Sequence, residues 1–342
     1  MTFTLHNLKA YSSILFLLCG LIMSSFGFHE VLTLTVFLLI FNFLFTRLKI
    51  LPVILITLYL FAFSILVLRN FSGFYGLIVL ASGVLLGYLR SQCSYNESES
   101  VARFIIFFSF IVIIYIVFNM VSGVDYNMIL PGSKNHFSTK GILLGFLVYL
   151  FSYKYRYIAL FIVGVFSLLS FSLSGLIILV CLSLFLIFIV FGVFSFKSTL
   201  VIFMLLVLFS IGFFDNSFVK YNSIDTTDFR YFVHANYLQN RSYFDLLFGY
   251  SGVDPFSYFS EIYGVYSLHS SYLHSIDRLG LIFVIPIFFV IFLISLKLSS
   301  FSRLFVLLVF IRGISDVVFL GHGHLDIIFT SLAILTYKKN YI

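Results

Sequence analysis

Charged residues are scarce along this chain of 342 residues. Only 10% of the residues are Asp, Glu, Lys or Arg, whereas 61% are hydrophobic, and the mean hydropathy is +1.14. A soluble globular protein carries about 25% charged residues, so this deficit predicts an integral membrane protein. The apolar runs are continuous rather than alternating, which favours an all-α polytopic fold over a membrane β-barrel. The formal charge of +7 therefore indicates orientation in a membrane, and no nucleic-acid partner is expected.

The common motifs of nucleotide and metal chemistry are also missing. The sequence has no Walker A motif, no G-x-G-x-x-G after a strand and no H-E-x-x-H. ATP-driven transport, dinucleotide chemistry and metalloprotease activity thus lose their usual signatures, and we expect no cofactor and no metal. The cysteines Cys19, Cys93 and Cys181 form no CxxC or Cys/His pattern, and two of them fall inside apolar runs, where we expect small core residues.

Long apolar runs are abundant, and they predict about twelve transmembrane helices in a single membrane domain of residues 1–342, since a helix needs about 20 apolar residues to span a bilayer and several of the predicted spans are shorter. The predicted spans are 11–28, 31–46, 50–68, 72–89, 103–121, 140–153, 157–173, 175–195, 198–214, 271–296, 303–320 and 325–337. The N-terminal run lacks a small-x-small cleavage site, and further spans follow at once. We therefore expect it to be a retained first helix rather than a signal peptide.

Basic residues fix the orientation of these spans. With the N-terminus inside, every inner connection carries lysine or arginine, as the positive-inside rule requires. These residues are Lys9, Arg47, Lys49, Arg90, Arg103, Lys154, Arg156, Lys197, Lys297, Arg303, Lys338 and Lys339. Both termini are then cytoplasmic, and two sizeable segments, about 122–139 and about 215–270, lie on the outer face. A long loop commonly forms a lid or a binding element, so we expect the function on the outer face.

The larger outer segment and the start of the next span concentrate ionisable residues. The stretches "LLFGYSG" and "SLHSSYLHSIDRLG" carry them, together with two arginines upstream. The residues of interest are Arg230, Arg241, Gly249, Gly252, His269, His274, Asp277 and Arg278. Glycines at this spacing let the backbone approach a ligand closely, arginine offers a bidentate fork to phosphate, and histidine can move a proton near neutral pH. The many aromatic rings of the segment suit sugar faces, although an interfacial aromatic belt is the favoured interpretation of any single ring.

In these residues the chain resembles the O-antigen polymerase and ligase superfamily, the Wzy-type membrane glycosyltransferases. The shared pattern is an arginine, a stretch ending in F-G and a second glycine, then a histidine followed by an aromatic residue and a glycine. It is formed here by Arg230, "LFGYSG", His269, "SSYLHSIDRLG" and Gly280. Upstream, "KNHFSTKGILLGFLVYL" and "LLSFSLSGLIILV" are similar to the family's helices between its two outer loops. The chain departs from the family at Ser270, where asparagine is common, at "SLSG", where many members have "SR", and in the first outer loop, which has lysine but no arginine.

The resemblance implies polymerisation of lipid-linked oligosaccharides. The glycan on undecaprenyl pyrophosphate would pass to an incoming lipid-linked repeat unit at the outer face of the bacterial inner membrane. Arg230 and Arg241 would hold the pyrophosphate and stabilise its charge as it leaves, and His269 would contact the same group or assist the acceptor hydroxyl. A carboxylate base, if one is used, would come from Asp277, Asp228, Asp254 or Glu261.

Further substrate contacts follow from the same resemblance. Asp277 and Arg278 are adjacent, so a structural ion pair is at least as good an interpretation as direct contact with substrate. The other predicted contacts are Gly249, Gly252, His274, Asn135, His136 and Lys140. The implied partners are undecaprenyl-pyrophosphate-linked glycans, the lipid bilayer, a chain-length regulator and a flippase.

Two rival functions stay open at this stage. An O-antigen ligase would move the same lipid-linked glycan to lipid A–core, and the motifs barely separate it from a polymerase. A non-catalytic polysaccharide flippase or transporter would fit the span count, but such proteins usually have repeated halves and charges near the bilayer midplane. Here the halves are unlike and the charges gather in one outer segment.

Two more polar groups lie near the end of the chain. Arg312 and Asp316 are spaced i, i+4 within one predicted span, so mutual neutralisation is expected, and lining a lipid-phosphate cavity is the alternative. The stretch "GHGHLD" could bind a metal through His322, His324 and Asp326, but it reads more simply as a short outer turn.

Overall fold

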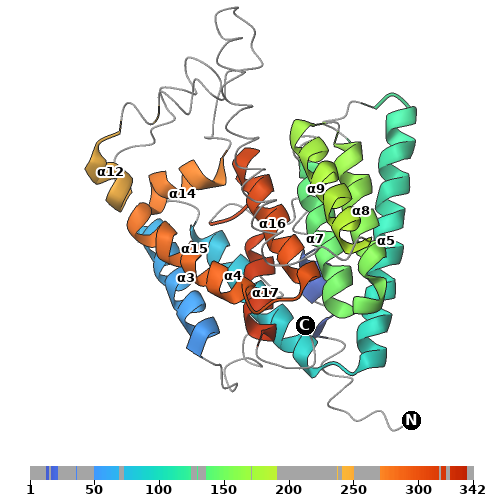
Figure 1. Ribbon diagram of the computed structural model, residues 1–342, viewed down its shortest axis with the longest axis horizontal. Helices are drawn as coiled ribbons and strands as arrows, with labels where there is room; N and C mark the ends of the chain where they lie inside the picture. Colours follow the sequence, from blue (N-terminus) through green and yellow to red (C-terminus); the bar gives the residue numbers. More distant parts are fainter. Residues whose placement is uncertain are drawn as a thin grey trace, which may run out of the picture. The chain divides into compact units, whose positions relative to one another are not determined.

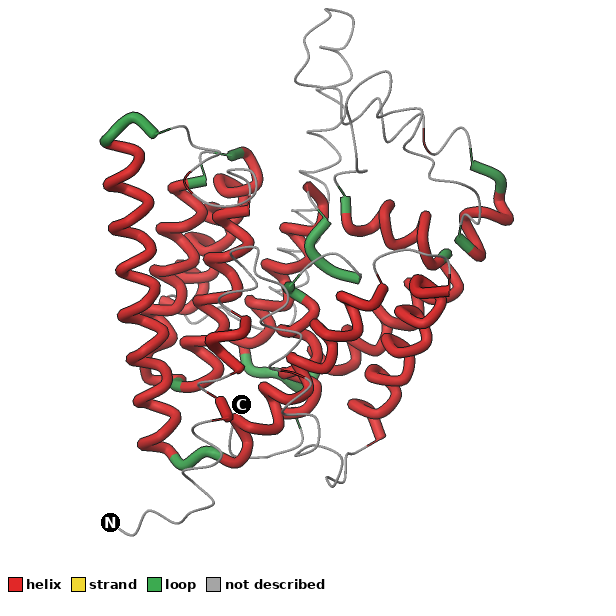
Figure 2. The backbone as a smooth tube through the Cα atoms, turned by 180° about the vertical axis from the view of Figure 1, so that it is seen from behind, coloured by secondary structure: helices red, strands yellow, loops and turns green. Residues whose placement is uncertain are grey.

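The structure is a computed structural model, and it describes residues 13–14, 17–21, 36, 50–68, 73–124, 129, 136–170, 172–190, 237, 241–249, 270–315, 317–320 and 324–336. Across these residues the chain is helical and contains no β-strand (Figure 2). The chain divides into two compact units. Unit 1 comprises Met1–Leu182, Pro286–Arg312 and Val318–Ile342, and unit 2 comprises Ser183–Ile285 and Gly313–Val317.

The helices follow the predicted spans closely wherever the structure describes them. They are α3 (Ile50–Leu68), α4 (Gly73–Gln92), α5 (Tyr95–Val121), α7 (His136–Phe151), η1 (Tyr153–Tyr155), α8 (Arg156–Leu169), α9 (Leu173–Val190), α12 (Tyr243–Phe248), α14 (Ser271–Leu279), α15 (Leu281–Ser295), α16 (Ser300–Ser315) and α17 (Asp326–Leu335). The all-α prediction is thus confirmed for the described residues. The predicted spans 11–28 and 31–46 are described at only a few positions, and 198–214 lies outside the described residues.

Three predicted boundaries need correction. Helix α5 begins eight residues before the predicted span, because Ser94 and Glu97 form a capping box that starts the helix in polar sequence. Helix α7 begins at His136, so the outer segment predicted at 122–139 ends earlier, and both His136 and Lys140 lie in a helix. The predicted span 271–296 is two helices, because Gly280 adopts φ +79° and ends α14 before α15 begins.

Glycine pairs bring helices of unit 1 into close contact. Gly83 and Gly87 of α4 lie against α17, and Gly141 and Gly145 of α7 lie against α8 (Figure 1). A Cβ atom on Gly87 would approach the carbonyl oxygen of Ser331 to 2.9 Å. Glycines four residues apart let helix backbones approach in this way, which is a common mode of packing between membrane helices.

The direction of these helices agrees with the predicted threading. On α4 and α17 the contacts advance together along both chains, from Gly83 opposite Ile327 to Gly87 opposite Ile334, so these helices are parallel. On α7 and α8 the contacts run in opposite senses, from Gly141 opposite Phe166 to Gly145 opposite Ala159, so that pair is antiparallel. The threading predicts both relations.

Large apolar side chains are exposed on the outward faces of several helices. On α5, Phe107, Ile114 and Phe118 are 66%, 65% and 68% exposed. Phe161 on α8 and Phe289 on α15 are also exposed. Within the described residues, α5 is the one helix that passes on both length and hydropathy as a membrane span, and shorter apolar helices accompany it.

At one end of unit 1, two arginines donate hydrogen bonds to carbonyl groups at the C-terminal ends of neighbouring helices. Arg90, in the last turn of α4, donates from Nε to the carbonyl oxygen of Leu150 in α7, at 2.8 Å. Arg303, in the first turn of α16, donates to the carbonyl oxygens of Ser295 and Leu296 after α15, at 3.0 Å each. The last carbonyl groups of a helix have no partner within it, so both arginines stabilise a neighbouring helix terminus.

More charged side chains gather at the same end. The Glu99 carboxylate accepts hydrogen bonds from Arg103, at 2.8 Å, and from Lys154, at 3.0 Å. These contacts join the start of α5 to η1. The Arg156 guanidinium lies 5.7 Å from the ring centroid of Phe301, at the start of α16. Basic residues that the threading assigns to inner connections therefore lie together at one end of unit 1.

Candidate functional site

Helix α14 of unit 2 buries its polar face. Its buried residues include Ser271, His274, Ser275, Asp277 and Arg278, which recur at helical spacings of three and four. Its apolar residues Tyr272, Leu273 and Ile276 are partly exposed. Leu279 is buried as well, so the buried face of α14 is mostly polar and places ionisable groups inside unit 2.

Asp277 pairs with two arginines. Its side chain is 1% exposed, and Oδ1 lies 3.3 Å from Nη2 of Arg241 while Oδ2 lies 3.7 Å from Nε of Arg278. Both arginine side chains are about nine-tenths buried, at 11% and 10% exposure. Two buried guanidinium groups therefore lie against one buried carboxylate, in a largely desolvated place.

The sequence around α12 positions Arg241. Ser242 caps the helix, accepting from the backbone N–H of Asp245 at 3.1 Å and donating to the Asp245 carboxylate at 2.6 Å. The guanidinium just before this cap lies 5.1 Å from the ring centroid of the buried Tyr237, a cation–π contact that limits its orientation.

Burial and charge act in opposite directions on the ionisable groups of this cluster. Burial raises the pKa of Asp277 above its ordinary value, and the positive charges of Arg241 and Arg278 oppose that rise. Burial also raises the pKa of Tyr237, with a further contribution from the Asp277 charge. Both groups come before the apolar helix α15 in the sequence.

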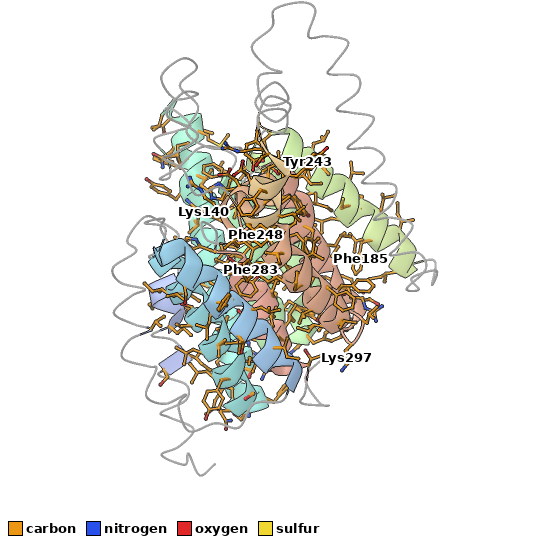
Figure 3. The ribbon with its side chains drawn as sticks, turned by 90° about the vertical axis from the view of Figure 1, so that its left-hand side faces the viewer. Lys140, Phe185, Tyr243, Phe248, Phe283 and Lys297 are labelled. Carbon is orange, nitrogen blue, oxygen red and sulfur yellow. The ribbon has the colours of Figure 1, made fainter. Side chains whose placement is uncertain are left out.

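Two glycines join α12 to α14 within unit 2. Gly249 and Gly280 end their helices with φ +79°, a conformation that suits glycine. A Cβ atom on Gly280 would lie 2.6 Å from the backbone N of Gly249, so the ends of the two helices are in direct contact (Figure 1). Gly249, predicted to allow close approach of the backbone to a ligand, instead lies against the end of the helix that carries Asp277. In Figure 3, Tyr243 and Phe248 mark α12.

Five of the predicted site residues lie on these two short helices or at their ends. They are Arg241, Gly249, His274, Asp277 and Arg278. The expected ion pair of Asp277 with Arg278 is present, at the long distance of 3.7 Å, and the shorter pair with Arg241 was not predicted. Arg241 and Asp277 are 36 positions apart in the sequence, and no sequence signal would have identified their pairing.

Other predicted residues lie outside the described part of the chain or elsewhere in it. Outside the described residues are Arg230, Gly252, His269, Asn135, Asp228, Asp254 and Glu261. His136 is the first residue of α7. Lys140 lies one turn later in unit 1, where it is 8% exposed.

Two polar groups of unit 1 have partners that the sequence did not predict. Arg312 is fully buried and donates from Nε to Oγ1 of Thr139, at 3.0 Å. Its predicted partner Asp316 lies outside the described residues. Asp326 accepts from the Tyr59 hydroxyl and from the Leu320 backbone N–H, both at 2.8 Å. Both Asp326 oxygens thus have hydrogen-bond donors, which favours the turn over the metal interpretation.

Neither metal-binding groups among the described residues nor similarity to known proteins indicates the function of this cluster. Among the described residues no group of three or more His, Cys, Asp and Glu side chains could hold a metal ion. Comparison with protein-family models, with curated proteins and with solved structures finds no match for this chain. Guanidinium groups such as those of Arg241 and Arg278 suit the binding of an anion such as a phosphate.

Proposed function

We propose that this protein is a Wzy-type polymerase of lipid-linked oligosaccharides in the bacterial inner membrane. It would transfer a glycan from undecaprenyl pyrophosphate to the terminal sugar of an incoming lipid-linked repeat unit, building O-antigen or capsular polysaccharide. The observation that carries this proposal is the buried cluster of Arg241 and Arg278 around Asp277, on and beside the helix α14 that comes directly before the apolar helix α15.

The proposal requires a polytopic membrane protein, with about twelve spans of about 20 residues, cytoplasmic termini, and outer loops near 122–139 and 215–270. Two features of unit 1 support this. The exposed side chains of Phe107, Ile114 and Phe118 on α5 are costly in water and suit lipid. The basic side chains gathered at one end of the unit agree with a cytoplasmic face.

The reaction breaks one bond and makes one. The bond between the anomeric carbon of the donor glycan and the pyrophosphate oxygen breaks, and the pyrophosphate leaves with the electron pair. The acceptor hydroxyl oxygen bonds to that carbon and loses its proton. Because the donor is already activated, no nucleotide is needed, in agreement with the missing nucleotide motifs.

The arginines, the aspartate and the histidine of the site would have different roles in this reaction. Arg241 and Arg278 would bind the pyrophosphate and stabilise the charge that grows on it. Asp277 is buried between them, so we assign it the positioning of both guanidinium groups. His269 lies two residues before α14, and we assign it the proton of the acceptor hydroxyl.

A genetic test uses the host's own polysaccharide. The gene is deleted and then complemented with wild type, Arg241→Gln, His269→Ala or the control Arg103→Gln, and the surface polysaccharide is separated on a gel. The control changes an exposed arginine that pairs with Glu99, away from the proposed site residues. We expect core with a single repeat unit to remain after deletion, and the ladder to return with wild type and control alone. If the single capped unit also disappears, polymerisation is not the first step lost, and a ligase or flippase function replaces the proposal.

A further inference from the structure

A partly buried arginine of unit 1 lies among three aromatic rings. The Arg156 guanidinium, at the start of α8, is 4.4 Å from the ring centroid of Tyr153 and 4.8 Å from that of Tyr157. The ring centroid of Phe301, at the start of α16, is 5.7 Å away. All three distances suit cation–π contacts. We call these four residues the Arg156 cluster, and Lys297, shortly before α16, marks this end of unit 1 in Figure 3.

Contacts between helix ends fix the rings of the Arg156 cluster. Phe301 meets Tyr153 and Tyr157 edge-on, with ring centroids 5.8 Å apart in both pairs. It also stacks on Tyr149 of α7, with centroids 6.1 Å apart, and the Tyr149 hydroxyl lies 2.8 Å from that of Ser302. The cluster is therefore assembled from η1, α8 and α16 before any ligand arrives, and such preorganisation lowers the cost of binding.

The described residues provide no counter-ion for Arg156. None of them places a carboxylate oxygen within 4.0 Å of its guanidinium. Its one hydrogen bond to them, from Nη1 to the carbonyl oxygen of Tyr153, is long at 3.4 Å, and Nε is buried with no partner. The Glu99 carboxylate at this end already accepts from Arg103 and Lys154. A desolvated cation normally has an anionic or hydrogen-bonding partner, so an external anion suits this place.

An exposed apolar face runs along α8 from the Arg156 cluster. Tyr157, Phe161 and Leu168 are exposed, and their spacing of four and seven residues places them on one side of the helix. Phe110 of α5 is exposed as well, and its ring centroid is 6.4 Å from that of Phe161. A basic group at one end of an apolar face matches a ligand with an anionic head and apolar chains, whereas a free phosphate ion would leave the apolar face unused.

We propose that the Arg156 cluster binds the phosphate of an anionic glycerophospholipid, whose acyl chains lie along the exposed face of α8. The guanidinium offers its planar fork of N–H donors to two phosphate oxygens, and the exposed rings of Tyr153 and Tyr157 suit the headgroup level of a bilayer. An anionic lipid is favoured over a zwitterionic one, because Arg156 repels a cationic headgroup. The choice of a lipid rests on the membrane placement in the proposed function, but not on polymerase activity.

Binding to the purified full-length protein in phosphatidylcholine nanodiscs tests the inference. Phosphatidylglycerol is titrated into the discs, and the lipids that the protein retains are counted by native mass spectrometry. Binding of radiolabelled inorganic phosphate is measured separately by equilibrium dialysis against pure phosphatidylcholine discs. The test variants are Arg156→Gln and Arg156→Lys, which keeps the charge but loses the planar fork. The matched control is Arg103→Gln, which removes an arginine charge at the same end of unit 1, from a residue paired with Glu99.

We expect Arg156→Gln to weaken the tightest binding of phosphatidylglycerol about 10-fold or more, since hydrogen bonds from a charged group are lost. Arg156→Lys weakens it about 3- to 10-fold, and the control changes it by about 2-fold or less. Where Arg156→Gln does not fold, Arg156→Lys decides alone.

Full affinity in Arg156→Lys, or an equal loss of affinity in Arg103→Gln, would reduce the effect to diffuse charge and overturn the site. If binding of inorganic phosphate alone falls in the Arg156 variants, the ligand is a free anion and the lipid is wrong. A wild-type protein that retains phosphatidylglycerol through Arg156 but extends no lipid-linked glycan refutes the polymerase and leaves the lipid site standing.

Discussion

Replacing Gly145 with alanine tests the packing that holds α7 against α8. A Cβ atom at this position would lie 2.6 Å from the carbonyl oxygen of Ala159. Ordinary contacts begin at 3.4 Å, so the helices must separate by about 0.8 Å (3.4 − 2.6). Val163 Cγ2 lies in the way as well, at 2.5 Å, but the Ala159 oxygen belongs to the backbone of α8, which cannot change rotamer to make room.

A second substitution, at Gly164, separates the free-energy cost of the steric clash from the effect of helix propensity. Overpacking of this kind typically costs about 1–3 kcal/mol, while alanine gains up to about 1 kcal/mol over glycine within a helix. Gly164→Ala on α8 obtains the same gain without the clash, because the nearest atoms to its added Cβ, from Leu179 and Leu182, lie at 3.7 and 3.9 Å. We therefore expect the free energy of unfolding of Gly145→Ala to be lower than that of Gly164→Ala by about 1–3 kcal/mol.

Unfolding of both variants in mixed micelles with increasing sodium dodecyl sulfate, followed by circular dichroism, gives these free energies. The wild-type protein sets the reference. If Gly145→Ala unfolds at the same detergent fraction as Gly164→Ala, or at a higher one, the close contact of α7 with α8 does not exist and the reasoning fails.

Three further predictions address other parts of the chain. Gly280→Ala forces alanine into a φ of +79° and against the N atom of Gly249, so it should destabilise the protein by about 1–3 kcal/mol and weaken pyrophosphate binding; retained binding and stability would contradict the α12–α14 contact. Tyr59→Phe removes the 2.8 Å hydrogen bond to Asp326 and should lower the free energy of unfolding by about 1.5–3 kcal/mol, measured in the same micelle assay, where no change would refute it. The pKa of Glu99, which precedes the apolar part of α5, is lowered to about 2 by its hydrogen bonds to Arg103 and Lys154. Its contribution to stability is therefore present above its ordinary pKa of 4.5 and lost as the pH falls towards 2; melting temperatures across this range should fall more for wild type than for Glu99→Gln, and equal falls would count against the ion pairs.

The apolar helices of unit 1 could be predicted from sequence because their runs are long and their ends are marked. The span 50–68 agrees with α3 at both ends. The start of α5 was missed because its first turns are polar and depend on the capping box of Ser94 and Glu97. The break at Gly280 was missed because one backbone conformation, invisible to hydropathy, divides a polar helix from an apolar one.

The partners of the site residues could not be predicted in the same way. Arg278 stands beside Asp277 in the sequence, and that pair was expected. The contacts of Asp277 with Arg241 and of Arg312 with Thr139 join residues far apart in the chain. Composition identifies such ionisable residues as unusual in an apolar chain, but only the packing of the helices selects which of them meet.

The arginines that bind the C-terminal carbonyl groups of neighbouring helices affect the order in which these helices can fold during synthesis. Arg303 completes the end of α15, yet it belongs to the following helix, so α15 leaves the ribosome with its last carbonyl groups still open. Arg90, by contrast, is synthesised well before the end of α7 that it completes. The end of α15 is therefore completed only when α16 has followed it, and under the proposed function the two helices are expected to enter the bilayer as a hairpin, whereas α7 can be completed as soon as it emerges.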